Sequence, residues 1–321
     1  MLFLAFATFS VGAQTPLEQA FNQLQKGSEF PEELQSTRSA VFLKVAVEGP
    51  NSKKSKTKLL AERLHKDLLK GHIDAVAYYR WQDLNTGLDA TESYLETIRA
   101  REIKQIVFLI SEAGNFQIYI IPTGEDPGLF AVDKKSWHTS GNSMEEVLGA
   151  LNAAVRRHDL EIANFLISDT PEYFVDTEVF TKNRFESFQP DLKLDKLAVP
   201  LFTGIDPENI EEPEDQTLQA IVQAKYPFNY ELVRTDLTED LMKKAGFHYV
   251  LRYLHGEEAT LMTLLDYRET ATNPEKMGYK FYMKHLVTGD IYLGNTWDIQ
   301  TNWQAALNKH LTNLRQTLKV E

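Results

Sequence analysis

The stretch that decides the fold spans residues 281–318 and reads FYMKHLVTGDIYLGNTWDIQTNWQAALNKHLTNLRQTL. It contains a strand pattern, the turn Thr288-Gly289-Asp290, a second strand pattern, Trp297 and then an apolar helical ladder. The ladder residues recur every three or four positions, as one buried face of a helix requires. They are Trp303, Leu307, Leu311, Leu314 and Leu318.

A similar stretch, residues 116–155, begins about 160 residues earlier. A strand pattern at 116–119 leads through a Gly/Pro turn to a second one at 129–131, and Trp137 precedes another ladder. The ladder residues are Met144, Val147, Leu148, Leu151 and Val155. The order strand, turn, strand, tryptophan, helix therefore occurs twice, which predicts a duplicated domain.

The remaining patterns extend both copies to the same plan. In the first repeat, residues 27–158, the earlier strand runs are 40–47, 73–79 and 106–110. In the second repeat, residues 186–321, they are 197–202, 228–233 and 247–253, with one extra strand expected at 260–268. Helical patterns separate these runs. We predict an α/β protein made of two tandem duplicated β-α-β-α-β-β-β-α units, with helices packed on mixed sheets.

Helix signals and apolar residues define the other parts of the chain. Residues 14–26 are expected to form an N-terminal helix, and residues 159–185 a connector that is too apolar to be a flexible linker. Capping boxes are expected where Glu or Gln follows a capping residue by three positions. The pairs are Ser143 with Glu146, Asp236 with Glu239, and Thr301 with Gln304. Gly246 suits the position after the helix at 237–245.

The N-terminus resembles a signal peptide. Residues 2–11 form an apolar run too short to cross a bilayer as a mature helix, and Val11-Gly12-Ala13 offers small residues for cleavage. The basic residue that usually precedes such a run is missing, and a buried N-terminal helix or strand is the alternative. We predict a signal peptide at 1–13, cleaved after Ala13, and a periplasmic or secreted product.

Composition excludes several classes of function. The chain of 321 residues has a net charge of −12, which argues against general binding to nucleic acid. It has no cysteine, which excludes disulfides, thiolate metal sites and cysteine catalysis. No later segment of the sequence approaches a transmembrane span, so peripheral attachment is the expected form of any membrane contact.

The second repeat resembles the N-terminal domain of TolB and the related domain of the curli secretion protein CsgG. The likeness covers about 125 residues and consists of core and turn positions. These positions are 196–202, 230–233, 246–251 and 288–290. His248 departs from the family, which usually has Asp there. The resemblance implies a non-catalytic envelope domain used in protein–protein assembly, and it implies no active site.

A lysine-rich loop is the first candidate site. Residues 49–57 lie between a strand and a helix, as a phosphate-binding loop does, but Pro50 and Ser55 replace the required glycines. A solvated basic loop is the simpler interpretation. Because lysines before a helix N-terminus oppose the helix dipole, we also consider an anionic partner for this loop. Its candidate residues are Lys53, Lys54, Lys56 and Lys58.

The aromatic and histidine candidates are weaker. Trp137 and Trp297 occupy matching places after the two hairpins. Two interpretations are open: these side chains stack on a ligand such as a sugar, or they cover the end of the adjacent helix. His248 and His255 bracket a strand, but no second cluster of ligands accompanies them. We predict no metal site, no cofactor and no catalytic residues, because the sequence has no nucleophile elbow and no zinc-binding helix.

These observations predict a non-catalytic, exported cell-envelope protein that acts as a scaffold or adaptor for unidentified envelope proteins. Two alternatives remain open at this stage. One is an envelope hydrolase whose site is assembled only in three dimensions. The other is a carrier that holds a small ligand in the cleft between the repeats.

Overall fold

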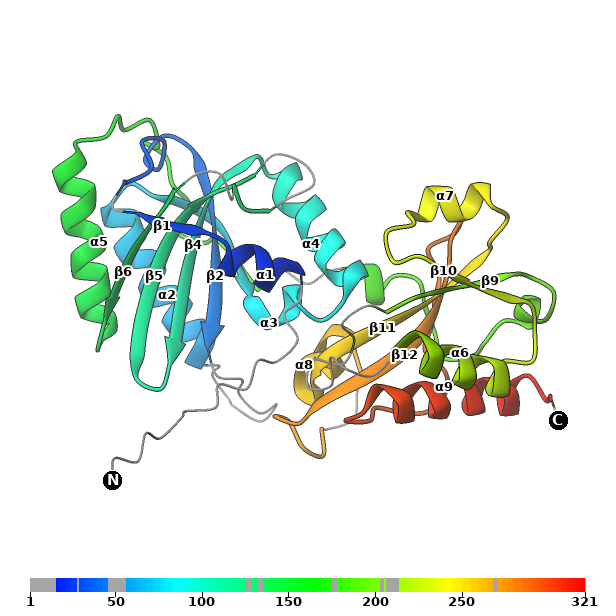
Figure 1. Cartoon of the computed structure of the whole chain (residues 1–321). Helices are drawn as coiled ribbons and strands as arrows, with labels where there is room; N and C mark the ends of the chain where they lie inside the picture. Colours follow the sequence, from blue (N-terminus) through cyan, green and yellow to red (C-terminus); the bar gives the residue numbers. More distant parts are fainter. Residues whose placement is uncertain are drawn as a thin grey trace, which may run out of the picture. The chain divides into compact units, whose positions relative to one another are not determined.

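The computed structural model describes residues 16–27, 29–45, 56–124, 129–131, 135–174, 178–202, 205, 214–267 and 271–320 (Figure 1). The chain folds into two compact units. The first unit contains Leu17–Lys182 and Leu254–Met277, and the second unit contains Asn183–Tyr253 and Gly278–Glu321. Residues 254–277 thus interrupt the second unit in the sequence and pack with the first.

The first unit is built on a mixed sheet. Its strands are β1 (Gln25–Gly27), β2 (Arg38–Val45), β3 (Asp74–Arg80), β4 (Ile103–Glu112), β5 (Asn115–Pro122), β6 (Lys135–Gly141) and β7 (Glu172–Tyr173). They lie in the order β1-β6-β5-β4-β2-β3-β7. β2 is parallel to β3 and β4, whereas β5 is antiparallel to β4 and β6.

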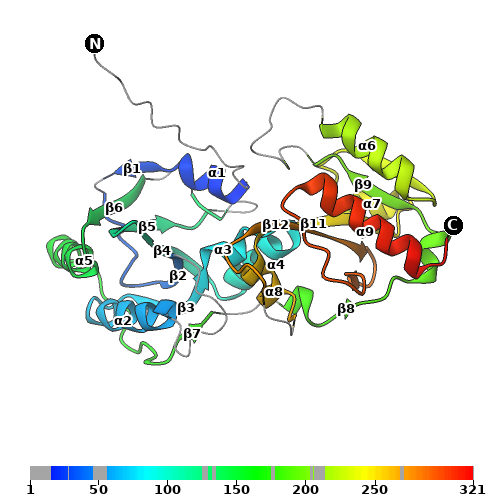
Figure 2. The same ribbon diagram turned by 90° about the horizontal axis from the view of Figure 1, so that it is seen from below.

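Helices cover both faces of this sheet because alternate residues of its strands are apolar on both sides. Val41 and Leu43 face α2 (Lys56–Lys70) and α5 (Met144–His158). Ala40 and Phe42 face α1 (Pro16–Asn22), α3 (Trp81–Leu84) and α4 (Leu88–Ala100). Figure 2 shows α2 and α5 next to each other on one side of the sheet.

The second unit has its own sheet. Its strands are β8 (Arg184–Phe185), β9 (Leu197–Pro200), β10 (Tyr230–Val233), β11 (Tyr249–Glu257), β12 (Met277–His285) and β13 (Ile291–Tyr292), in the order β10-β9-β11-β12-β13-β8. The helices α6 (Glu214–Lys225) and α9 (Trp303–Thr317) lie side by side on one face (Figures 1 and 2). α7 (Glu239–Lys244) covers the other face. The short 3-10 helix η2 (Pro190–Lys193) precedes β9, whereas η1 (Glu178–Phe180) belongs to the first unit and contacts α4.

The two sheets share one strand order. Reading β6-β5-β4-β2-β3 in the first gives the same succession as β13-β12-β11-β9-β10 in the second. Each is extended by a short preceding strand, β1 or β8, that runs parallel to the last hairpin strand. The predicted α/β class with mixed sheets is confirmed, whereas descent of the units from one duplicated ancestor stays a prediction.

Several local predictions were wrong. The extra strand expected at 260–268 is a helix, α8 (Glu258–Leu264), which packs against α3. α7 is capped by Thr238 instead of Asp236, and α9 by Asn302 instead of Thr301. The expected N-terminal helix stops at Asn22, because Gln25–Gly27 pair with β6 instead.

Other local predictions are confirmed. The Ser143 hydroxyl accepts a hydrogen bond from the Glu146 backbone N–H at 3.2 Å, as expected of a cap of α5. Gly246 has φ of 82° after α7, a left-handed conformation that glycine adopts without strain. The predicted signal peptide lies outside the described residues.

Candidate functional site

The first unit contains an open pocket of about 960 Å³. It lies where the three parallel strands begin, since Arg38, Asp74 and Ile103 are the first residues of β2, β3 and β4 and all line it. The other polar lining residues used below are Arg99, Glu102, Lys104 and Asn164. The apolar ones are Leu95, Ile98, Leu129, Phe165 and Leu166.

The end of α4 forms one wall of this pocket. Ile98 is buried in the core, while the neighbouring Arg99 is exposed, as in an amphipathic helix. The helix ends at Ala100, and Glu102 then adopts φ of 56°, which turns the chain into β4. Lys104 follows as the second residue of β4, so helix and strand bring their charged side chains to one edge of the sheet.

Another wall comes from a segment without regular secondary structure, residues 163–167, which we call the strap and of which 163–166 line the pocket. The backbone N–H groups of Ala163 and Asn164 both donate to the Gln35 carbonyl, at 3.1 and 3.0 Å. The Asn164 amide donates to the carbonyls of Thr37 and His72, each at 3.2 Å. These bonds connect the strap to the residues just before β2 and β3.

The strap displays large apolar side chains although its N-terminal end is held in place. Phe165 is 78% exposed and Leu166 is 97% exposed. Within the same expected connector, Phe180 is fully buried and Tyr173 and Phe174 pack on the core. Contiguous exposed apolar surface of this kind marks a binding surface more often than chance.

The charges in the pocket are only partly paired. Arg38 lies 3.8 Å from the Glu102 carboxylate and donates to the Arg101 carbonyl at 3.3 Å. Burial raises the pKa of Asp74, while the charges of Arg38 and His65 act in the opposite direction. The Lys104 side chain is exposed and has no hydrogen bond or ion pair with any described residue. Lys104 is therefore a cation of the pocket that no described residue pairs.

None of the site residues predicted from the sequence lines this pocket. Lys53 and Lys54 lie outside the described residues, and Lys56 and Lys58 lie in the first turn of α2, with the Lys58 ammonium 6.0 Å from the centre of the Tyr173 ring. Trp137 lies in β6, is buried and meets Phe30 edge-on at 5.3 Å between ring centres.

The remaining candidates lie in the second unit. Trp297 is half-buried in the segment between β13 and α9. His248 is half-exposed, and its Nδ1 lies 3.4 Å from the Asp195 carboxylate. Among the described residues, no group of three or more His, Asp or Glu side chains has an arrangement that would hold a metal ion.

The pocket residues were missed because they are spread over five segments of the sequence. One signal was available: polar residues stand at or beside the start of three runs predicted to be strands. Because the amino ends of parallel strands meet at one sheet edge, Arg38, Asp74 and Lys104 were candidates for a common site.

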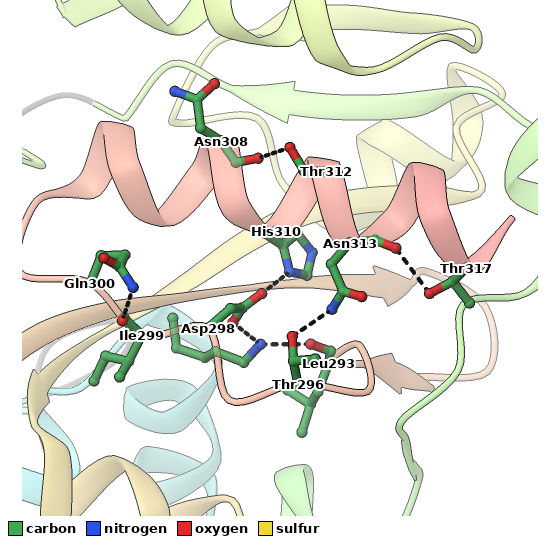
Figure 3. A network of polar contacts seen from close by, with 11 residues as sticks. Leu293, Thr296, Asp298, Ile299, Gln300, Asn308, His310, Thr312, Asn313 and Thr317 are labelled. Atoms are coloured by element: carbon green, nitrogen blue, oxygen red, sulfur yellow. Dashed lines mark hydrogen bonds and ion pairs between the residues drawn. The ribbon is translucent and has the colours of Figure 1, made fainter. Parts of the chain in front are cut away.

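A second polar cluster was also missed, and it lies inside the second unit (Figure 3). The Lys280 ammonium is ion-paired with Asp298 and donates to the Leu293 carbonyl at 2.6 Å. Asp298 Oδ2 lies 3.5 Å from His310 Nδ1. These three side chains are 1%, 1% and 0% exposed. The spacing of His310, seven residues after Trp303 on the predicted helix ladder, was the available signal for its burial.

Burial governs the protonation of this cluster. Burial lowers the pKa of His310 and that of Lys280, and in both cases Asp298 opposes the shift. Burial acts to raise the pKa of Asp298, but the charge of Lys280 and the contact with His310 hold it below its ordinary value. Asp298 is thus the ionised partner of Lys280. Because solvent does not reach these atoms, the cluster holds the segment between β13 and α9 in place instead of acting on a substrate.

Gly294 allows this segment to approach α9. It has φ of 79°, and a Cβ added there would lie 2.5 Å from the Asn313 amide nitrogen and 3.3 Å from the Phe188 ring. The Asn313 amide also donates to the Thr296 hydroxyl at 3.1 Å (Figure 3). Gly289 has a similar φ of 74° but nothing within 4 Å of such a Cβ.

We expect Gly289→Ala to destabilise the second unit by about 1–2 kcal/mol through backbone strain alone. Gly294→Ala should be at least about 1 kcal/mol worse, because the crowded methyl adds to the same strain. Chemical denaturation of the two variants beside the parent protein measures the difference. Equal losses for both glycines would show that the contact with Asn313 and Phe188 has no influence on stability.

Comparison of the chain with protein-family models, with curated proteins and with solved structures finds no significant match. In the part of the chain that the structure describes, no helix combines the length and the apolar composition needed to cross a bilayer.

Proposed function

We propose that this is an exported cell-envelope protein, periplasmic or secreted, that works by binding a protein partner and not by catalysis. The observation that supports this most strongly is the strap, which presents Phe165 and Leu166 to solvent beside an open, partly cationic pocket. Such a surface suits a scaffold or adaptor.

The energetics of the strap favour an interaction surface. Exposing one large apolar side chain forgoes about 1.5–3 kcal/mol of burial free energy. Phe165 and Leu166 both lack this free energy of burial. The strap is nevertheless held by hydrogen bonds to Gln35, Thr37 and His72 and is not a frayed end. A partner that covers Phe165 and Leu166 would gain this free energy on binding, with little loss of backbone entropy in Ala163 and Asn164.

The ionisable side chains favour binding over catalysis. In the pocket, Arg38 already pairs with Glu102, and Asp74, whose pKa is raised by burial, has Arg38 as its main opposing charge. In the second unit, the cluster of Lys280, Asp298 and His310 is sealed from solvent. Neither set of described residues presents a nucleophile and a base to a substrate.

The sequence supports the proposed localisation in the cell envelope. The apolar run at 2–11 followed by Ala13 favours export, and the absence of cysteine is compatible with an oxidising compartment. The resemblance of the second repeat to TolB and CsgG domains favours an assembly role. We propose envelope proteins as the partners, with peripheral contact with the membrane as a further possibility, and no role for nucleic acid or a cofactor.

Photo-cross-linking from the strap tests the proposal. A photoreactive phenylalanine analogue at Leu166 should give one reproducible cross-linked protein in intact cells. The same analogue at Val287, which is 71% exposed in the second unit, should not give that product. Adding Phe165→Asp should remove the product, because a charge replaces the apolar contact. If Leu166 and Val287 give the same pattern, the strap is not a binding surface.

A further inference from the structure

We propose that the strap and the pocket together bind an extended peptide segment of the partner, in which a carboxylate is flanked by apolar side chains. This inference rests on the proposed function and names the chemistry of the segment that the partner presents. Three features of the first unit support it: unpaired backbone groups in the strap, an unpaired cation in the pocket, and apolar residues in the pocket lining.

The backbone of the strap has unused hydrogen-bonding groups. The N–H groups of Leu166 and Ile167 and the carbonyls of Phe165 and Leu166 make no hydrogen bond with any described residue. Extended peptides bind such groups by adding a strand, and the main-chain hydrogen bonds then contribute affinity that does not depend on sequence. A lipid or another small amphiphile lacks the matching alternation of donors and acceptors.

The charge of the pocket selects the side chain of that peptide. Arg38 is paired with Glu102 and is also close enough to Asp74 to act on its pKa, so its charge is compensated within the protein. Lys104 has no such compensation from the described residues. A carboxylate placed against Lys104 gains a charge-assisted hydrogen bond, whereas an ammonium there is repelled.

The apolar lining accounts for the flanking positions. Leu95 and Ile98 of α4 and Leu129 line the same pocket as Lys104, and Leu95 is the most exposed of these three apolar side chains. A volume of about 960 Å³ is at the upper end of the range for small-ligand sites and accommodates several side chains of a strand. In a peptide bound as a strand, alternate side chains face the same side. Apolar residues two positions from the carboxylate would therefore contact this apolar lining.

Two pools of synthetic peptides test the inference. Each peptide is about eight residues long, within the usual range of strand lengths, with randomised apolar positions and one fixed central residue. That residue is Glu in one pool and Lys in the other, and fluorescence polarisation at low salt measures binding to the purified full chain. We expect the Glu pool to bind at least about tenfold more tightly than the Lys pool. The same Glu pool with N-methylated backbone amides should lose most of its affinity.

Variants of the protein sharpen the test. Lys104→Glu should abolish the preference for the Glu pool, and Lys104→Arg should retain it, because the charge is the same. Lys193→Glu, an exposed lysine of the second unit, is the matched control for the change in net charge and should leave binding unchanged. Equal binding of the Glu pool to the parent protein and to Lys104→Glu would overturn the inference.

The source of the carboxylate is tested separately. A Glu-free pool with a free C-terminal carboxylate distinguishes a chain terminus from an acidic side chain, and either result supports the inference. Binding of sodium dodecanoate with no binding of any peptide pool would overturn it in favour of a small amphiphile. A cross-link from Leu166 in cells without any preference for the Glu pool would overturn this inference while leaving the proposed function intact.

Discussion

Replacing Lys280 with methionine is expected to lower the free energy of unfolding of the second unit by about 3–5 kcal/mol. The variant leaves the Asp298 carboxylate buried without its cation, and the remaining neighbour, His310 Nδ1, is 3.5 Å away. Breaking a buried pair is more costly than lacking it, because one charge is then left without compensation. Amide hydrogen exchange of β12 and α9 measures the loss of stability in the second unit alone, so the stability of the first unit does not obscure the result.

The double variant Lys280→Met/Asp298→Leu distinguishes two causes of the stability loss, the uncompensated charge of Asp298 and the lost packing of the Lys280 side chain. It removes both charges and should recover much of the stability lost in Lys280→Met. Lys244→Met, an exposed lysine of α7 in the same unit, should change stability by no more than about 0.5 kcal/mol. A double variant as unstable as the sum of its single variants would show that the ion pair is not the reason for the loss.

The second unit is also expected to lose stability in mild acid because of His310. Burial lowers the pKa of this histidine in the folded state, whereas in the unfolded chain it titrates near about 6.5. Below that pH the unfolded chain binds a proton that the folded protein does not bind. Stability is therefore present above about pH 6.5 and falls as the pH falls, by up to about 1.4 kcal/mol per pH unit, until the folded pKa is reached.

Comparison with His310→Leu isolates this contribution. The pKa of Asp298 is also lowered, so its contribution to stability also falls as the pH falls. That loss occurs only below the ordinary pKa of a carboxyl group. In the first unit, burial and the charge of Glu275 raise the pKa of Glu257 to about 7, which gives a slope of the opposite sign. The difference between the parent protein and His310→Leu in the local exchange of α9 removes the effect of Glu257, and Asp298 titrates below the range from about pH 7 to pH 5. A difference that stays constant from about pH 7 to pH 5 would contradict the assignment.

The predictions that succeeded depend on local sequence. Strands β2 and β4 are buried on both faces, so they are recognisable as continuous apolar runs at 40–47 and 106–110. The cap of α5 is recognisable because Ser143 and Glu146 are three residues apart and act within one turn. The α/β class with mixed sheets follows from the same runs, since strand patterns alternate with helical patterns and end in hairpins.

The predictions that failed depend on what a segment packs against. Residues 259–262 and 264 are all buried, so α8 shows no periodicity that distinguishes it from a strand. Phe165 and Leu166 have the composition of core residues, yet they are exposed because Ala163 and Asn164 donate hydrogen bonds to carbonyls of residues that precede β2 and β3. Lys280 lies in an apolar strand, and its partners Asp298 and His310 come from other segments.

We expect the strap and its pocket to bind a partner through an acidic, apolar peptide segment. Tandem mass spectrometry of the product cross-linked from Leu166 in intact cells tests it most directly, because it identifies the residues of the partner that touch the strap. We predict a single partner segment with apolar residues and an Asp, a Glu or the chain terminus within a few positions of the cross-link. Attachment to many unrelated proteins, or to a basic segment, would contradict the account.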